Sequence, residues 1–154
     1  MINLKMRTVL CDLDHTISNA AWRDPMIGVD TWDEYHSELI HDDPIEEMVW
    51  LINSMSLSGY LIVGLTSRPN KFRQLTMDWL VKHGVLMDDI IMRADDAFHP
   101  APELKMAMAI AKFETIERIK NEVAMVIDDR EDVCVAFRAI GLTTLQVSAR
   151  NVYT

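Results

Sequence analysis

The chain has 154 residues, of which 49% are hydrophobic, and this is enough for one compact domain with a sizeable core. Its formal net charge of −9 argues against a broad nucleic-acid-binding surface, because such a surface needs clustered Lys and Arg side chains. A small anionic ligand, held by a few local cations or by a metal ion, is still compatible with this charge. The absence of a GxxxxGK[ST] motif argues against a P-loop kinase.

We expect no membrane span and no secretory signal. No apolar run approaches the ~18 residues that a membrane helix needs, and the first residues, MINLKMRTVLCD, lack the apolar core and cleavage site of a signal peptide. The two cysteines, Cys11 and Cys134, lie in apolar segments without CxxC spacing, so we expect buried free thiols. Together these features predict a cytoplasmic protein with a single domain over residues 1–154.

The first elements in chain order are a buried strand, a polar segment and a helix. Residues 7–13 (RTVLCDL) predict the strand, and the polar residues 15–42 predict a short flap, over 17–42, with one helical turn. In the next segment, DDPIEEMVWLINSMSLSG, Asp43 fits a helix N-cap and Pro44 the first turn. A helix with a capping-box-like start is therefore expected here, ending at a glycine.

Strands and helices alternate along the rest of the chain. The remaining strands are predicted over residues 60–66, 89–93, 123–128 and 143–148, and the remaining helices over 68–84, 102–113 and 131–141. The strands are continuous apolar runs, which is typical of a parallel sheet that helices cover on both faces. Right-handed crossovers then predict an α/β fold with a doubly wound, Rossmann-like sheet of five strands.

Polar residues stand at the carboxyl ends of three of these strands, which is where open α/β sheets bind their ligands. They are Asp12 and Asp14 after the first strand, Thr66, Ser67 and Arg68 after the second, and Asp128 and Asp129 after the fourth. If the first and fourth strands are neighbours, four carboxylates face one another, and such a cluster stays ionised only beside a cation. The oxygen-only ligand set suits Mg²⁺.

A carboxylate beside such a metal that is not needed as a ligand could attack an electrophile, and a phosphoryl group is the natural one. Thr66 and Ser67 stand just before a predicted helix, so their hydroxyls and the helix N-terminal amides could bind its oxygens. Lys105, early in the helix predicted over 102–113, could supply a positive charge. These features predict phosphoryl chemistry at the carboxyl ends of the strands.

The order DLDHT, LTSRP, PELK and IDDR resembles the four motifs of the haloacid dehalogenase (HAD) superfamily of phosphatases. The resemblance implies that Asp12 is the nucleophile and forms a phosphoaspartate, and that Asp14 is the general acid and base. It implies that Thr66 binds the phosphoryl group and that Lys105 pairs with Asp12 and the phosphoryl oxygens. The implied Mg²⁺ ligands are Asp12, the backbone carbonyl of Asp14, and Asp128 with or without Asp129.

Two longer segments, residues 48–80 and 123–151, are similar to the phosphatase domain of bacteriophage polynucleotide kinase-phosphatases and their stand-alone relatives. This similarity implies removal of a 3′-phosphate from a nucleic-acid end or a nucleotide, with Arg68 holding the substrate phosphate. The chain departs from the family pattern at four positions. His15 and Ser67 stand where glycine is usual, and His99 and Ala101 replace an Arg and an Asp before the lysine motif. The missing acid leaves the orientation of Lys105 and the substrate preference open.

The gaps between the motifs are too short for a full cap domain. The 50 positions from Thr16 to Thr66 already include a helix, and the 39 from Thr66 to Lys105 include a helix and a strand. The predicted site is therefore open, shielded only by the flap, and could accept a bulky strand end. In the flap, Arg23, Trp22, Trp32 and Tyr35 are candidate phosphate or base contacts, and simple flap packing is the alternative for each. Arg23 is the strongest of these candidates.

Two other functions stay open at this point. A nucleotidase for free (deoxy)nucleoside 5′-monophosphates fits the acidic net charge better than a polynucleotide enzyme does. A non-catalytic binding module that keeps the fold is the second alternative, and the intact set of motif residues argues against it. The histidines outside the motifs are expected on the surface. They are His36, His41, His83 and His99.

Overall fold

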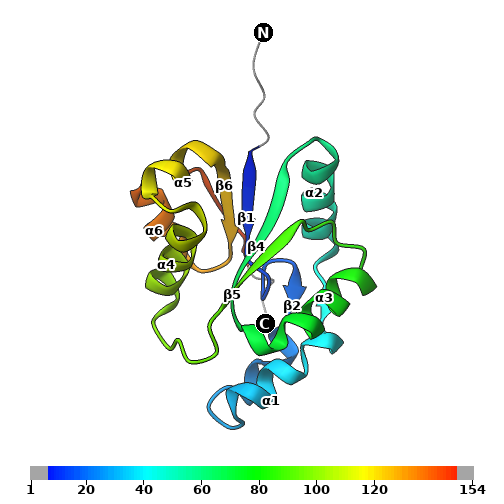
Figure 1. Ribbon diagram of the computed structural model, residues 1–154. Helices are drawn as coiled ribbons and strands as arrows, with labels where there is room; N and C mark the ends of the chain where they lie inside the picture. The colour runs from blue at the N-terminus through cyan, green and yellow to red at the C-terminus, as the bar shows by residue number, and fades with distance from the viewer. Residues whose placement is uncertain (1–6, 149–154) are drawn as a thin grey trace.

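The computed structural model describes residues 7–148, and a five-stranded parallel sheet lies at its centre. The strand order is β5-β4-β1-β6-β7. The strands are β1 (Thr8–Cys11), β4 (Leu61–Pro69), β5 (Asp89–Arg93), β6 (Val123–Asp128) and β7 (Thr144–Gln146). The chain adds β4 and β5 on one side of β1 and then crosses back to add β6 and β7 on the other (Figure 1). The predicted doubly wound α/β fold is confirmed.

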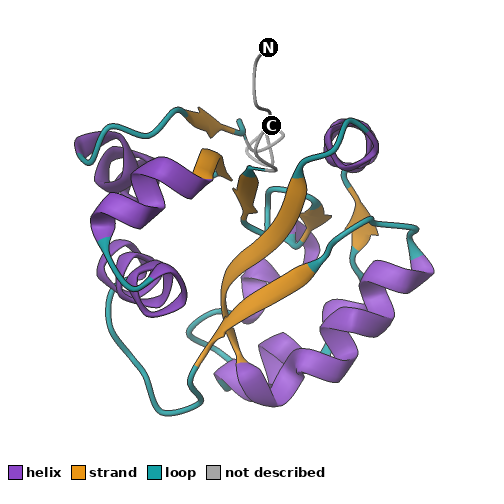
Figure 2. Ribbon diagram, turned by 45° about the horizontal axis from the view of Figure 1, so that its top comes forward, coloured by secondary structure: helices purple, strands orange, loops and turns teal. Residues whose placement is uncertain are grey.

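Helices cover both faces of this sheet (Figures 1 and 2). One face carries α2 (Glu46–Leu57) and α3 (Arg73–Lys82), and the other carries α4 (Ala101–Phe113), α5 (Ile116–Glu122) and α6 (Glu131–Ala139). Successive side chains of β1 point to opposite faces of the sheet, so they pack alternately against the two helix layers. Val9 and Cys11 pack in the α2–α3 core, whereas Leu10 packs in the α4–α6 core.

The segment predicted as a flap with one helical turn is more ordered than expected. It contains β2 (Ser18–Asn19), a 3₁₀ helix η1 (Ala21–Met26), α1 (Trp32–Ser37) and a second 3₁₀ helix η2 (Leu39–His41). The helix α1 begins with a capping box, in which the side chains of Thr31 and Glu34 each accept a hydrogen bond from the other residue's backbone N–H. This capping box identifies a helix that the polar composition of the segment concealed.

The start of α2 also differs from the prediction. Asp43 and Pro44 form β3 and pair antiparallel with β2, so neither residue begins the helix. The helix begins at Glu46, after Ile45, and has no side-chain cap. The expected capping-box-like start is therefore wrong, because Asp43 and Pro44 pair with Asn19 and Ser18 and bring the two ends of the flap together.

The strand β4 runs further than the predicted 60–66. Thr66, Ser67 and Arg68 lie within it, and a 3₁₀ helix η3 (Asn70–Phe72) separates it from α3. These residues therefore do not stand at the N-terminus of α3, and the expected use of that helix's amides at the site is wrong. The helix α5 was not predicted, since its seven residues are highly charged; Thr115 caps it by accepting a hydrogen bond from the backbone N–H of Arg118.

Three further expectations concern the chain as a whole. Cys11 and Cys134 are free and buried, as predicted. Within residues 7–148, no helix has both the length and the apolar character that crossing a membrane requires. The single domain over residues 1–154 stays a prediction, and the two ends of that range lie outside the described residues.

Leu10 at the centre of the sheet provides a test of the core. Leu10→Ala should lower the free energy of unfolding by about 2–5 kcal/mol, because the side chain is fully buried between β1 and the α4–α6 layer. Leu57→Ala is the matched control, since this leucine is 82% exposed at the end of α2. Urea unfolding of both variants measures the difference, and equal losses would contradict the described burial.

Candidate functional site

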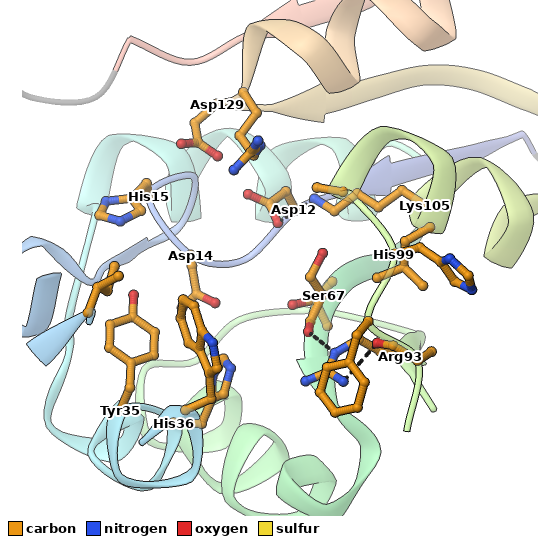
Figure 3. A pocket seen from close by; sticks show the side chains of 18 residues that line it. Asp12, Asp14, His15, Tyr35, His36, Ser67, Arg93, His99, Lys105 and Asp129 are labelled. Atoms are coloured by element: carbon orange, nitrogen blue, oxygen red, sulfur yellow. Dashed lines mark hydrogen bonds and ion pairs between the residues drawn. The ribbon is translucent and has the colours of Figure 1, made fainter. Parts of the chain in front are cut away.

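A pocket of about 520 Å³ opens at the carboxyl ends of β1, β4 and β6 (Figure 3). Asp12 and Asp14 follow β1, Thr66 and Ser67 come from β4, and Lys105 comes from α4. Flap residues from η1 to α1 and the loop between β5 and α4 form the walls. Together with Asp129, which follows β6, these residues converge on the pocket from four separate elements.

Three carboxylates meet in this pocket. The strands β1 and β6 are neighbours, with Cys11 opposite Ile127, so Asp12 lies beside Asp128. One carboxylate oxygen from each of Asp12, Asp128 and Asp129 lies within 4.8 Å of the others. Burial and the negative charge of Asp12 raise the pKa of Asp128 to about 6 and that of Asp129 to about 8. The cluster thus lacks the positive charge that its ionised form requires.

Lys105 supplies part of that charge. Its Nζ lies 2.8 Å from Asp12 Oδ1 and 2.5 Å from Asp128 Oδ2, and the side chain is only 2% exposed. Burial alone would lower the pKa of this ammonium group, but Asp12 and Asp128 raise it above its ordinary value. The two carboxylates orient Lys105 although position 101 is an alanine.

The donor set fits a divalent cation. Three ionised carboxylates and one ammonium group leave two uncompensated negative charges, and all the ligand atoms are carboxylate oxygens, which Mg²⁺ prefers. Asp12, Asp128 and Asp129 are the residues that would hold such an ion. The carboxylate of Asp14 is not part of this group, so the metal role of its backbone carbonyl stays a prediction.

The turn after β1 sets the orientation of Asp12. The hydroxyl of Thr16 donates a hydrogen bond to Asp12 Oδ2 (2.9 Å), and the backbone N–H of Asp12 donates to the carbonyl of Ile127. Between Asp12 and Thr16, His15 adopts a positive φ of 62°, which explains why glycine is usual at this position. Its Nε2 lies 3.1 Å from Asp24 Oδ1, a contact that glycine could not make.

Asp14 has a very different environment from Asp12, although only one residue separates them. Its Oδ1 accepts hydrogen bonds from Nη2 of Arg23 (2.6 Å) and of Arg68 (2.8 Å), and its Oδ2 accepts from Nε of Arg68 (3.1 Å). Burial would raise the pKa of Asp14, but Arg68 and Arg23 hold it well below its usual range. Asp14 is therefore ionised when these contacts are present.

The two arginines are not placed as expected. Both were predicted to contact the substrate, yet Arg68 is 1% exposed, Arg23 is fully buried, and neither lines the pocket. Arg68 also donates to the hydroxyl of Thr76 (3.2 Å), and Arg23 also pairs with Asp42 (2.7 Å). In this arrangement both guanidinium groups bind the carboxylate of Asp14, which itself lines the pocket, and Arg23 also binds the buried Asp42.

Asp42 is a site residue that the sequence did not reveal. This buried carboxylate accepts hydrogen bonds from Ser18 Oγ, Trp22 Nε1 and Arg23 Nε at 2.5–2.8 Å. Asp42 therefore holds the flap in place. Its hydrogen bond with Trp22 favours flap packing for that residue over a contact with substrate. The sequence signal for Asp42 was the pair Asp42-Asp43 before Pro44. A helix start needs only one N-cap residue, so the second aspartate was left without a role.

The remaining candidates also divide between pocket and packing. Thr66 lines the pocket, and its hydroxyl accepts a hydrogen bond from the backbone N–H of Arg68. Trp32 and Tyr35 line the pocket from α1, and Tyr35 packs against the guanidinium of Arg23 at 4.3 Å. His36 was expected on the surface but is buried; it stacks on Trp32 and lines the pocket, and its burial lowers its pKa to about 4.

Comparisons with known proteins concern the family and the fold. The profile of the family described as "Polynucleotide kinase PNKP phosphatase domain" matches residues 6–152. A comparison with curated protein sequences gave no significant match. The chain is similar to a solved structure described as a Pnkp1/Rnl/Hen1 complex, with 23% identity and a TM-score of 0.77 over 94% of this chain and 47% of that one. The chain thus spans about half the length of that relative.

Two further solved structures share the fold over most of their length. A predicted phosphatase from Clostridium acetobutylicum has 16% identity and a TM-score of 0.68, over 94% of this chain and 85% of that one. A HAD-hydrolase from Bacillus subtilis, solved with bound magnesium, has 17% identity and a TM-score of 0.61, over 93% and 89% of the two chains. The expected HAD-like fold is therefore confirmed.

The pair of Arg23 and Asp42 provides a test of the flap anchor. Arg23→Ala should lower the free energy of unfolding by about 3–5 kcal/mol, because it leaves Asp42 buried without a compensating charge. Combining it with Asp42→Asn should cost clearly less than the sum of the single changes, which urea unfolding of all four forms measures. Arg118→Ala, at an exposed ion pair, should leave the stability nearly unchanged. Additive losses would contradict the pairing.

The pKa of Asp129 predicts how the stability without metal depends on pH. A folded-state pKa near 8, above the ordinary 3.8, means that the folded state binds the extra proton, so the stability falls as the pH rises to 8. The window from pH 6.5 to 8 lies above the range in which His36 titrates, from 6.5 to about 4. Urea unfolding in EDTA should show this fall, and excess Mg²⁺ should abolish it. The same pH dependence with and without Mg²⁺ would rule out a metal at these carboxylates.

Proposed function

We propose that this chain, which belongs to the polynucleotide kinase PNKP phosphatase domain family of HAD phosphatases, is an Mg²⁺-dependent enzyme that removes a 3′-phosphate from nucleic-acid ends or nucleotides. The observation that carries the proposal is the contact of Lys105 with Asp12 inside the carboxylate cluster. A lysine and a divalent cation together could hold a phosphoryl group against Asp12. Family membership supports the 3′-phosphate as the substrate.

In the first step, an oxygen of Asp12 attacks phosphorus, and the bond between phosphorus and the ester oxygen of the substrate breaks. The leaving oxygen takes a proton and departs as an alcohol, which leaves a phosphoaspartate. In the second step, water attacks phosphorus, and inorganic phosphate and the free carboxylate are formed. When bound by Asp12, Asp128 and Asp129, Mg²⁺ would neutralise charge on the phosphoryl oxygens. Thr66, which also lines the pocket, would bind one of those oxygens.

Asp14 is the acid and base of this scheme, and its two arginines decide when it can act. The ionised form described above suits the second step, in which Asp14 accepts a proton from water. For the first step it must carry a proton. Arg68 does not line the pocket, so its contact with Asp14 would have to loosen when substrate binds, and the pKa of Asp14 would then rise. The arginines would then act on substrate through Asp14.

Two alternatives are tested by the same substrate panel. A nucleotidase acting on 5′-monophosphates remains compatible with the acidic chain and a pocket of about 520 Å³. A non-catalytic module is disfavoured by the intact contacts between Lys105, Asp12 and Asp128. Phosphate release should be compared for a 3′-phosphorylated oligonucleotide, its 5′-phosphorylated counterpart, and nucleoside 3′- and 5′-monophosphates. Faster release from the 5′-phosphates would overturn the proposed substrate. A cytoplasmic location also stays a prediction.

Asp14→Asn should separate the two chemical steps. The substitution removes proton transfer, so turnover of a nucleoside 3′-phosphate should fall by about 10²–10⁴-fold. With p-nitrophenyl phosphate the leaving group needs no proton, so rapid mixing should show a burst of nitrophenolate followed by slow hydrolysis of the phosphoaspartate. Asp132→Asn is the control, because Asp132 is exposed and pairs with Arg130. If Asp14→Asn lacks a burst and slows both substrates equally, Asp14 does not have this role.

A further inference from the structure

Arg93, the last residue of β5, is a buried cation without a carboxylate partner. Among the residues that the structure describes, four Arg and Lys side chains are buried, and three of them, Arg23, Arg68 and Lys105, form ion pairs. Arg93 is only 8% exposed and forms no ion pair within 4.0 Å in residues 7–148, although Asp95 and Asp33 lie near enough to act on its charge. A buried charge is costly unless it is compensated, so an unpaired guanidinium on the wall of a pocket indicates an external anion.

The hydrogen bonds of Arg93 fix its position without neutralising it. Its Nε donates to the carbonyl of Ser67 (2.9 Å), and its Nη1 donates to the carbonyl of Ala97 (2.9 Å) and, at longer distances, to those of Ala94 and Asp95. All of these acceptors are neutral backbone groups. The third nitrogen, Nη2, makes no hydrogen bond to any described residue. The guanidinium is therefore held rigidly with one nitrogen available.

Ser67 provides the second, independent observation. Its Oγ is buried and has no hydrogen-bond partner among the described residues, although its carbonyl accepts the bond from Arg93. Ser67 and Arg93 both line the pocket, and Ser67 lies between Asp12 and Arg93 in Figure 3. An unsatisfied hydroxyl beside an unpaired guanidinium is a donor pair suited to phosphate oxygens.

The ring of Phe98 lies 5.2 Å from Cζ of Arg93. Phe98 is 79% exposed, and its ring covers one side of the guanidinium. An apolar cover lowers the local dielectric and strengthens the attraction between Arg93 and an anion. This location is separate from the carboxylate cluster, where Asp12 and Lys105 would hold the phosphoryl group that reacts.

We propose that Arg93 and Ser67 bind a second phosphate of the substrate, next to the one that is removed. This inference rests on the proposed function and specifies its substrate class. Two sources share this chemistry: the phosphodiester that precedes a 3′-phosphorylated nucleotide in a strand, and the 5′-phosphate of a nucleoside 3′,5′-bisphosphate. A nucleoside monophosphate would leave Arg93 unpaired, so the site prefers substrates with two phosphates.

The test compares kcat/KM for thymidine 3′-monophosphate, thymidine 3′,5′-bisphosphate and a 3′-phosphorylated thymidine dinucleotide. The wild-type protein should prefer one or both of the last two, and whichever is preferred identifies the source of the second phosphate. Arg93→Gln should reduce this preference by about 10- to 100-fold, the value of charge-assisted hydrogen bonds. Arg73→Ala is the matched control, because Arg73 also donates to a backbone carbonyl, that of Ile90, but does not line the pocket.

Ser67→Ala keeps the test decisive if Arg93→Gln does not fold. The hydroxyl makes no internal hydrogen bond, so its removal breaks none, and it should reduce the preference by about 3- to 10-fold. Equal losses on all three substrates in Arg93→Gln would show that Arg93 only holds the loop at Ala97. A wild-type protein without any preference would also overturn the proposal.

Binding measurements separate this proposal from the proposed function. Calorimetry on the Asp12→Asn variant gives the affinities for thymidine 3′-monophosphate and thymidine 3′,5′-bisphosphate without turnover. The bisphosphate should bind more tightly than the monophosphate, and adding Arg93→Gln should remove this difference. That result would support the second phosphate site even if no 3′-phosphate is hydrolysed. If all three substrates are hydrolysed but the two ligands bind with equal affinity, the proposed 3′-phosphatase activity is supported and the second phosphate site is contradicted.

Discussion

The excess of negative charge where β1 and β6 end is the constraint on which the rest of the site depends. The parallel pairing of these strands brings Asp12 and Asp128 together, and Asp129 adds a third carboxylate. The ammonium group of Lys105, from α4, compensates one of these negative charges, and its side chain is almost completely buried. What is left has the charge and the oxygen ligands that a divalent cation requires.

The two aspartates of DLDHT illustrate how position alone divides chemical roles. Asp12 faces the carboxylate cluster, where negative charge is in excess and neighbouring carboxyl groups have raised pKa values. Asp14 faces two guanidinium groups, where positive charge is in excess and its own pKa is lowered. One residue separates the two positions, so a single turn after β1 supplies both the carboxylate proposed as the nucleophile and a carboxylate that is held ionised by arginines.

The alternation of strands and helices, the burial of both cysteines and the convergence of the motif residues could be predicted from the sequence. They depend on continuous apolar runs and on polar residues at strand ends, which are local signals. The orientation of Arg23 and Arg68 could not be predicted in this way. Each pairs with a carboxylate chosen by the fold, at separations of up to 54 residues, and nothing local distinguishes such an arginine from one that binds substrate.

The flap and the end of β4 were mispredicted for a related reason. The β2–β3 ribbon contains only four residues, which is too short to produce a period in the sequence. The strand β4 extends through Pro69, which pairs with Arg93 of β5, and Arg93 also donates a hydrogen bond to the carbonyl of Ser67. Both features depend on contacts between segments, and the extension of β4 places Ser67 at the pocket.

A crystal structure with Mg²⁺ and beryllium fluoride, which mimics a phosphoaspartate, tests the central claim most directly. The account predicts a trifluoroberyllate group bonded to a carboxylate oxygen of Asp12, with Lys105 against its fluorine atoms and Mg²⁺ bound by Asp12 and Asp128. Beryllium fluoride bonded to Asp14, or a metal bound away from the three clustered carboxylates, would contradict it.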